Sequence, residues 1–264
     1  MVSPMWPTRP DLVRTELTLL SFRKDSGGMR LVDAAADLLL GACCAGCGTP
    51  GLGVCPQCRT RLIQAPQRLV RPLWGTDLPP VFSALRYQPP VSRLVVAHKD
   101  QAALQLVRPL AELLTVSVRA SLSDTATDSR IALVPVPSDR QTVQRRGYDH
   151  ADALARATGR LVGLPTRRLL ARTGAVLDQH VLNRAQRWSA QQASMTAVPG
   201  NSTVVLIDDV FTTGATACEA VRALAAAGHR VLAVAVVADT ALRAESSVSR
   251  PVSGGVSTPN AEDG

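Results

Sequence analysis

The stretch Val204–Thr216 constrains this 264-residue chain more than any other part of it. The apolar run Thr203–Ile207 shows no alternation, which predicts a strand covered on both faces in a parallel sheet. Asp208 and Asp209 stand at its expected carboxyl end, where open α/β sheets bind ligands. A turn rich in Thr and Gly follows, and then a helix-forming run from Ala215 to Ala227. Since a helix start presents unpaired backbone N–H groups, this turn is suited to hold a phosphate.

The side chains of the turn support that interpretation. Thr212, Thr213 and Thr216 bring hydroxyl groups, and Gly214 allows close approach of the backbone. The two preceding carboxylates are placed to accept hydrogen bonds from a sugar diol or to approach a cation. A capped helix after a strand, with its acids in a solvated turn, is the plainer alternative.

The string VVLIDDVFTTGAT resembles the phosphoribosyl pyrophosphate (PRPP) motif of type I phosphoribosyltransferases. In that family the acidic pair holds the ribose hydroxyls and the following loop holds the 5′-phosphate. The resemblance assigns PRPP binding to eight residues: Asp208, Asp209, Phe211, Thr212, Thr213, Gly214, Ala215 and Thr216. From about Met29 to Thr240 the chain also resembles the ComF-like branch. The implied fold class is α/β, a type I phosphoribosyltransferase-like parallel sheet flanked by helices, with a small N-terminal zinc ribbon.

The cysteines form a second signal, because five of the six fall between Cys43 and Cys58. Two C-x-x-C pairs can present four thiolates to a structural zinc ion, with no position left open for water. The predicted ligands are Cys44, Cys47, Cys55 and Cys58. Cys43 could replace Cys44, although the spacing favours Cys44. A disulfide framework is the alternative, and it would suit a secreted mini-protein.

The segment between the two signals alternates strands and helices. We expect strands at Val81–Tyr87, Ile131–Val136 and Arg230–Val237, and helical structure in two pieces around Asp100 within Val91–Ala120. Such alternation predicts right-handed crossovers and a parallel sheet.

The turn after Val136 corresponds by resemblance to the pyrophosphate loop of the related transferases. The residues assigned to the pyrophosphate side are Pro137, Ser138, Arg140, Arg145, Arg146 and Lys99. A solvated helix-end charge is an equally good interpretation of Lys99, and an exposed helix flank is one for the arginines. Asp149-His150 stands where relatives carry Asn-Gln. We expect His150 to lie on the polar face of a helix. By the same resemblance, the stretch Leu169–Ala193 is expected to form a flap over the site, and charges on a solvated helix are an equally good interpretation of its arginines.

The predicted organisation has four parts. Residues 1–28 are expected to be a disordered or mis-assigned extension, with Met29 as a possible true start. Residues 29–66 would hold an amphipathic helix and the zinc ribbon, and residues 75–240 the phosphoribosyltransferase-like domain. The polar tail, residues 241–264, is expected to be disordered.

Two functions follow from these features. The first is a Mg²⁺-dependent enzyme that transfers phosphoribosyl from PRPP and releases pyrophosphate. The second is a non-catalytic sensor of a phosphorylated ribose, or a single-stranded-DNA-binding protein of a competence-like uptake system. The net charge of +8 suits a phosphate-bearing partner, but aromatic residues make up only 3%, which disfavours a stacking platform for bases. We expect a cytoplasmic protein with no membrane span. The acceptor and the oligomeric state cannot be read from the sequence.

Overall fold

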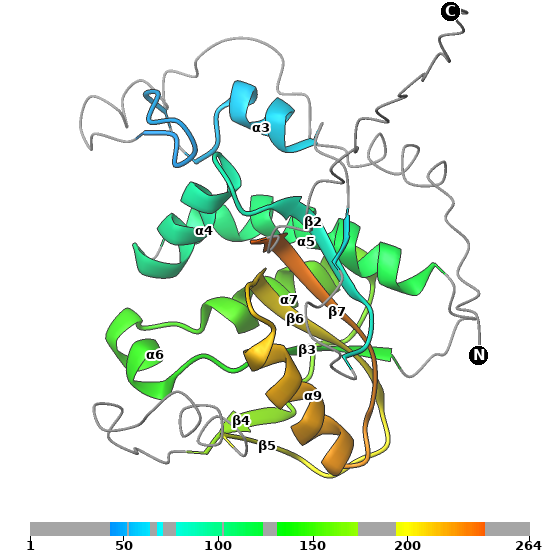
Figure 1. Ribbon diagram of the computed structural model, residues 1–264. Coiled ribbons are helices and arrows are strands. Elements are labelled where there is room, and N and C mark those ends of the chain that lie inside the picture. Colours follow the sequence, from blue (N-terminus) through cyan, green and yellow to red (C-terminus); the bar gives the residue numbers. More distant parts are fainter. Residues whose placement is uncertain are drawn as a thin grey trace, which may run out of the picture.

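A computed structural model describes residues 43–51, 53–63, 68–70, 78–101, 103–123, 131–173 and 194–240 (Figure 1). The predicted extension 1–28, the predicted amphipathic helix after Met29, most of the predicted flap and the tail 241–264 lie outside the described residues.

A parallel sheet forms the centre of the structure, as predicted. Its five strands are β1 (Arg68–Val70), β2 (Val81–Arg86), β3 (Ile131–Pro135), β6 (Thr203–Phe211) and β7 (Arg230–Asp239). They lie in the order β1-β2-β7-β6-β3, and all neighbours are parallel except β1 with β2. The antiparallel edge strand β1 falls in the gap between the two predicted domains and was not predicted.

Helices cover both faces of this sheet (Figure 1). The first face carries α5 (Val107–Leu122) and α7 (His150–Val162), and the opposite face carries α9 (Ala215–Ala226). The centre of β6 accordingly alternates between two apolar clusters. Val205 and Ile207 belong to the cluster under α5 and α7, whereas Val204 and Leu206 belong to the cluster under α9. This two-sided burial explains why the strand reads as an unbroken apolar run.

The chain leaves β3 and β6 in opposite directions. After β3 it forms α7 on the first face and returns at Thr166, which pairs in parallel with Leu133 on the free edge of β3. After β6 it forms α9 on the other face and enters β7 on the far side. The carboxyl ends of β3 and β6 are therefore the topological switch point of the sheet, where ligands bind in open α/β folds.

Smaller elements surround this switch point. They are α3 (Pro56–Ile63), α4 (Val91–Asp100), the short 3₁₀ helix η2 (Leu104–Leu106), α6 (Arg140–Arg146), β4 (Leu170–Arg172) and β5 (Met195–Ala197). α4 and α5 confirm the two predicted helical pieces around Asp100. β4 and β5 form an unpredicted antiparallel pair, which is joined to α9 because Glu219 accepts a 2.9 Å hydrogen bond from the Met195 amide.

The strand expected to end at Ile207 continues to Phe211. β3 stops opposite Ile207, but β7 goes on pairing with β6 until Phe211 lies opposite Asp239. Asp208 and Asp209 therefore lie within the strand, just beyond the point where β3 has ended, and not at its last residues. Among the described helices, none is long and apolar enough to cross a membrane.

A glycine within α7 sets how closely the chain returns to the sheet. A Cβ at Gly159 would lie 2.7 Å from the Leu164 carbonyl oxygen and 2.7 Å from Thr166 Oγ1. Ala is favoured over Gly in a helix by about 1 kcal/mol, but overpacking costs about 1–3 kcal/mol. We expect Gly159→Ala to destabilise the protein in urea denaturation. Arg160→Ala, at the exposed neighbouring position, should change stability little, and a net gain for Gly159→Ala would contradict the close packing.

Candidate functional site

Two loops meet at the switch point. The first, Val136–Asp139, follows β3, and the second, Thr212–Gly214, joins β6 to α9. The Val136 amide bonds the Ile207 carbonyl at 2.9 Å, so the first loop begins directly beside the acidic pair of β6. The sequence prediction that these two segments share one crevice agrees with this arrangement.

Asp208 and Asp209 differ sharply in their surroundings. Neighbouring strand residues point to opposite faces; Asp209 is buried, whereas Asp208 is partly exposed. Asp208 Oδ1 accepts a 2.9 Å hydrogen bond from the Asp209 amide. Burial raises the pKa of Asp208 to about 7, and the adjacent negative charge of Asp209 adds to this effect. The pair therefore combines one carboxyl group that resists ionisation with one that is ionised.

Two basic side chains account for the ionised state of Asp209. Burial alone would raise its pKa, but a hydrogen bond from His150 and the positive charge of Lys99 outweigh burial and hold the pKa well below its usual range. Lys99 Nζ lies 2.9 Å from Oδ2 and 3.2 Å from Oδ1 of this carboxylate. His150 Nε2 lies 3.5 Å from Oδ2. Lys99 therefore forms an ion pair with Asp209, which differs from the solvated helix-end charge considered above.

His150 is buried, so its prediction as a polar surface residue of a helix was wrong. It opens α7, and the Asp149 carboxylate caps that helix by accepting bonds from the amides of Ala151 and Asp152. The Ser138 hydroxyl donates to Asp149 at 2.9 Å and lies 3.3 Å from His150 Nδ1. The His150 ring therefore connects three parts of the structure: the loop after β3, the start of α7 and the acid of β6.

A second histidine extends this arrangement toward α4. His98 is fully buried in the last turn of α4, and burial lowers its pKa. The Tyr148 hydroxyl donates to the His98 carbonyl and lies 3.4 Å from its Nδ1. The rings of His98 and His150 meet edge to face with centroids 6.3 Å apart. Sequence reasoning missed His98 and Tyr148, although Tyr148 stands beside the predicted loop.

The loop before α9 has the backbone shape required at a phosphate site. Gly214 adopts φ +83°, and a Cβ there would lie 2.9 Å from the Phe211 ring, so this position requires glycine. Gly214 precedes a 12-residue helix and supplies no side-chain cap. Thr212 and Thr213 are exposed, and the Ala215 amide approaches Thr213 Oγ1 at 3.4 Å. Two exposed threonines therefore lie at the start of α9, where unpaired backbone amides favour an anion.

The remaining predicted residues lie around these loops. Phe211 is buried at the end of β6, and Thr216 is half-buried in the first turn of α9. The Pro137 carbonyl accepts a 2.9 Å bond from Arg172 Nε of β4, which ties the first loop to the small sheet. Arg140, Arg145 and Arg146 form part of the backbone of α6, and their side chains lie outside the described structure.

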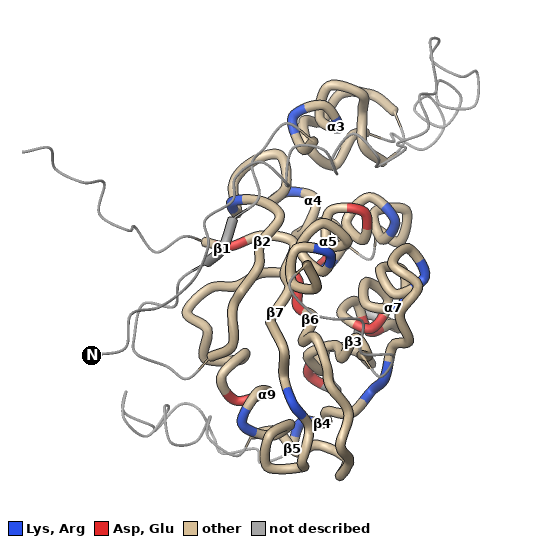
Figure 2. Tube along the Cα trace, turned by 90° about the vertical axis from the view of Figure 1, so that its right-hand side faces the viewer, with Lys and Arg blue, Asp and Glu red and all other residues tan. Residues whose placement is uncertain are grey.

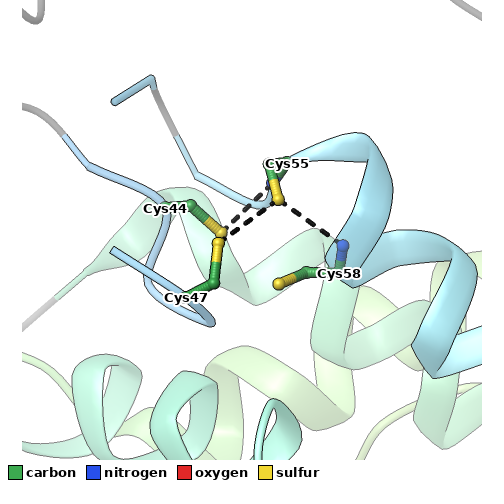
Figure 3. Close-up of side chains that lie close together, drawn as sticks. All are labelled: Cys44, Cys47, Cys55 and Cys58. Carbon is green, nitrogen blue, oxygen red and sulfur yellow. Dashed lines mark hydrogen bonds between the residues drawn. The ribbon is translucent and has the colours of Figure 1, made fainter. Parts of the chain in front are cut away.

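The second candidate site is the cysteine cluster shown in Figure 3. The sulfur atoms of Cys44, Cys47, Cys55 and Cys58 all lie within 4.8 Å of one another. Tetrahedral zinc with Zn–S bonds of about 2.3 Å places its sulfurs about 3.8 Å apart, so the four thiols fit a zinc ion. Cys43 is exposed outside this group, which favours Cys44 as the first ligand.

Hydrogen bonds to sulfur also fit a thiolate site. The amides of Gly46 and Cys55 lie 3.4 and 3.3 Å from the sulfur of Cys44. A hydrogen bond with the Thr49 hydroxyl lowers the pKa of Cys47 to about 6, whereas burial raises the pKa of Cys55 and of Cys58. Donors directed at sulfur stabilise the deprotonated form that a metal needs.

The cluster packs against the first turn of α4. A Cβ at Gly46 would lie 2.9 Å from the sulfur of Cys58, 3.1 Å from Pro90 and 3.2 Å from Leu94. Arg93 donates to the Gly46 carbonyl at 3.3 Å. One end of α4 thus carries the cysteine module, and the other end carries His98 and Lys99.

Charges elsewhere do not gather on one side. In the part of the chain that the structure describes, Lys and Arg are interspersed with Asp and Glu along the trace (Figure 2). Although the net charge of the chain is +8, the basic residues of the described part do not form a continuous stripe in this view.

Comparison with known proteins shows a family match over part of the chain. Residues 142–255 match the phosphoribosyl transferase domain family. The match begins after β3 and includes α7, β6, α9 and β7, and hence Asp208, Asp209 and the loop before α9. A search of curated proteins found no match.

Solved structures were matched at low identity. Adenine phosphoribosyltransferase from Rhodothermus marinus is 15% identical, with a TM-score of 0.33, and the match covers 69% of this chain and 86% of that one. Glutamine PRPP amidotransferase from B. subtilis is 18% identical, with a TM-score of 0.32 and coverage of 49% and 26%. A structure described as the allosteric regulatory enzyme of purine biosynthesis gives 18% identity, a TM-score of 0.34 and coverage of 50% and 26%. The chain thus spans about a quarter of the length of the last two proteins.

The raised pKa of Asp208 predicts how stability depends on pH. Between about pH 4 and pH 7 the folded protein keeps a proton that the unfolded chain has released, so stability falls as pH rises. Asp208→Asn keeps the Oδ1 acceptor and removes the charge. We expect its stability relative to wild type to rise between pH 5 and pH 8, by about 1–3 kcal/mol, in urea denaturation.

Asp139→Asn is the matched control for that experiment. Hydrogen bonding to the Thr142 amide lowers the pKa of this exposed cap, so the carboxyl group is ionised throughout pH 5 to pH 8 in both states. The difference in free energy of unfolding between Asp139→Asn and wild type should therefore not change between pH 5 and pH 8. An equally flat difference for Asp208→Asn would show that Asp208 ionises normally.

The cysteine cluster predicts about one zinc ion per chain. Cys55→Ser should release the metal and lower thermal stability, because the module shares its apolar core with α4. Cys43→Ser, which changes an exposed cysteine outside the cluster, should retain zinc. Elemental analysis of freshly reduced protein is the measurement, and wild-type protein without zinc would rule the site out.

Proposed function

We propose that this protein binds PRPP, or another ligand built on ribose 5-phosphate, and transfers the phosphoribosyl group with release of pyrophosphate. One observation carries the proposal. The acidic pair and the threonine-lined start of α9 lie together at the switch point of a parallel sheet, within residues that match the phosphoribosyl transferase domain family.

Each proposed contact follows from a group at that point. Asp208 and Asp209 would accept hydrogen bonds from the ribose hydroxyls. The 5′-phosphate would lie against Thr212, Thr213 and the amides that open α9, where the helix dipole favours an anion. The remaining residues of the phosphate loop are Phe211, Gly214, Ala215 and Thr216.

The pyrophosphate group would then lie toward the loop after β3. Pro137 and Ser138 belong to this loop, and Arg140, Arg145 and Arg146 follow it in α6. Guanidinium groups offer forked donors to phosphate oxygens. Lys99 reaches the same region from α4.

Phosphoribosyl transfer demands little covalent chemistry from the protein. The bond from the anomeric carbon to pyrophosphate breaks as the acceptor nucleophile attacks, through a sugar with oxocarbenium character. The chain would hold the diol and the phosphate in fixed positions and stabilise the departing negative charge.

Two metals are part of the proposal. The oxygen donors of Asp208 and the ligand's own phosphates are of the kind that Mg²⁺ prefers, and Mg²⁺ would neutralise pyrophosphate as it leaves. Zinc at the four cysteines would be structural, since four thiolates leave no open position. The cysteine cluster beside a phosphoribosyltransferase-type domain also supports the finer assignment to the ComF-like branch. Reduced thiols suit the cytoplasm, where we place the protein.

The test of ligand binding is the double variant Asp208→Asn, Asp209→Asn. We expect its affinity for PRPP with Mg²⁺ to fall about 100-fold or more, because the charged acceptor Asp209 and the second carboxyl acceptor Asp208 are both lost. Isothermal titration calorimetry measures the affinity, and circular dichroism checks that the variant is folded. Unchanged affinity in a folded variant would show that the acids do not bind the ribose.

Catalysis needs a separate measurement from binding. Pyrophosphate release from PRPP should be followed against a panel of nucleobases and amines, with wild type and the double variant in parallel. Release with one acceptor class identifies the transferase reaction. Tight PRPP binding without release for any acceptor would favour the sensor function over the enzyme.

A further inference from the structure

Lys99 and His150 approach the same carboxylate, but their side chains differ in exposure to solvent. The Lys99 side chain is 39% exposed, whereas those of Asp209 and His150 are 4% and 8% exposed. His150 is fixed by its place at the start of α7 and by Ser138 and Asp149. The solvent-facing side of the Asp209 carboxylate is therefore the side that Lys99 occupies.

The helix that carries Lys99 is anchored next to this residue, whereas the Lys99 side chain is partly exposed. Leu94 and His98 of α4 are fully buried, and the Tyr148 hydroxyl donates to the His98 carbonyl. A lysine stem has four rotatable carbons and a compact charge, so its ammonium can change partner without movement of the helix.

The proposed ribose contact competes with this ion pair. Lys99 Nζ lies within 3.2 Å of both oxygens of Asp209, so it occupies acceptor sites that a diol would use. A carboxylate has about four lone-pair sites, and burial beside His150 leaves few of them open. A diol that binds Asp209 must therefore displace the ammonium.

We propose that Lys99 is an exchangeable counter-ion, released from Asp209 by the ribose hydroxyls and taken up by the phosphate groups attached to the anomeric carbon. This inference rests on the proposed function, and it assigns Lys99 a specificity role at the same site. A ligand that has both the diol and the anomeric pyrophosphate gives the displaced ammonium a new partner. A ligand that has only the diol does not.

This exchange predicts opposite effects on two ligands when Lys99 is replaced. Lys99→Met keeps the length of the side chain and removes its charge. For PRPP with Mg²⁺, we expect affinity to fall about tenfold or more, since a charged donor to phosphate is lost. For ribose 5-phosphate, affinity should stay equal or rise, because the competing ammonium is gone. Isothermal titration calorimetry on the full chain measures both.

The alternatives give different patterns in the same experiment. A lysine that merely attracts anions would weaken both ligands in Lys99→Met by a similar factor, and a lysine with no role at the site would change neither. Either pattern overturns the exchange. Arg160→Met, which removes one positive charge at the far end of α7, should leave both affinities unchanged. Failure of wild type to bind either ligand would instead reject the proposed function itself.

A spectroscopic readout observes the ammonium directly. The chain has only two lysines, Lys24 and Lys99, so ¹³C-dimethylation gives a simple spectrum in which Lys99→Met identifies the Lys99 signal. Ribose 5-phosphate should move that signal toward the position of a solvent-exposed lysine, and PRPP should move it to a different position. A signal that does not move when either ligand is bound would overturn the exchange.

Discussion

The buried carboxylate of Asp209 is the group on which the arrangement of the site depends. A buried charge is costly unless it is paired and hydrogen-bonded. Here the two partners come from elements far apart in sequence, Lys99 from α4 and His150 from α7. Satisfying this one charge therefore brings α4, α7 and β6 together at the switch point. Lys99 and His150 both contact this carboxylate, so one buried acid connects α4 and α7 with β6.

The cysteine module is connected to this site through α4. Its sulfurs pack against the first turn of α4, and the last turn of that helix carries His98 and Lys99. Leu94 and His98 are four residues apart, so they lie on the same buried face of the helix. The cysteine module and the acid of β6 therefore contact opposite ends of the same ten-residue helix.

The sequence predicted the elements whose signals are local, and missed those that depend on distant partners. The apolar run before Asp208, the turn at Gly214 and the paired cysteines each carry their pattern within a few residues, so the parallel sheet and the four-cysteine cluster were predicted correctly. β1, β4 and β5 are three residues each, too short for a periodic pattern. The end of β6 was misplaced because its continuation to Phe211 depends on β7, which enters much later in the chain.

The dipeptide Asp149-His150 shows how such a departure from a familial pattern can be compensated. In the fold, the Asp149 carboxylate accepts hydrogen bonds from the Ala151 and Asp152 amides and from the Ser138 hydroxyl. That use fixes the start of α7, and the start of α7 places the His150 ring between Ser138 and Asp209. An imidazole has one ring nitrogen facing each of these neighbours, whereas a side-chain amide carries both of its N–H donors on a single nitrogen. Asp149 and His150 therefore link the loop after β3 to the acid of β6.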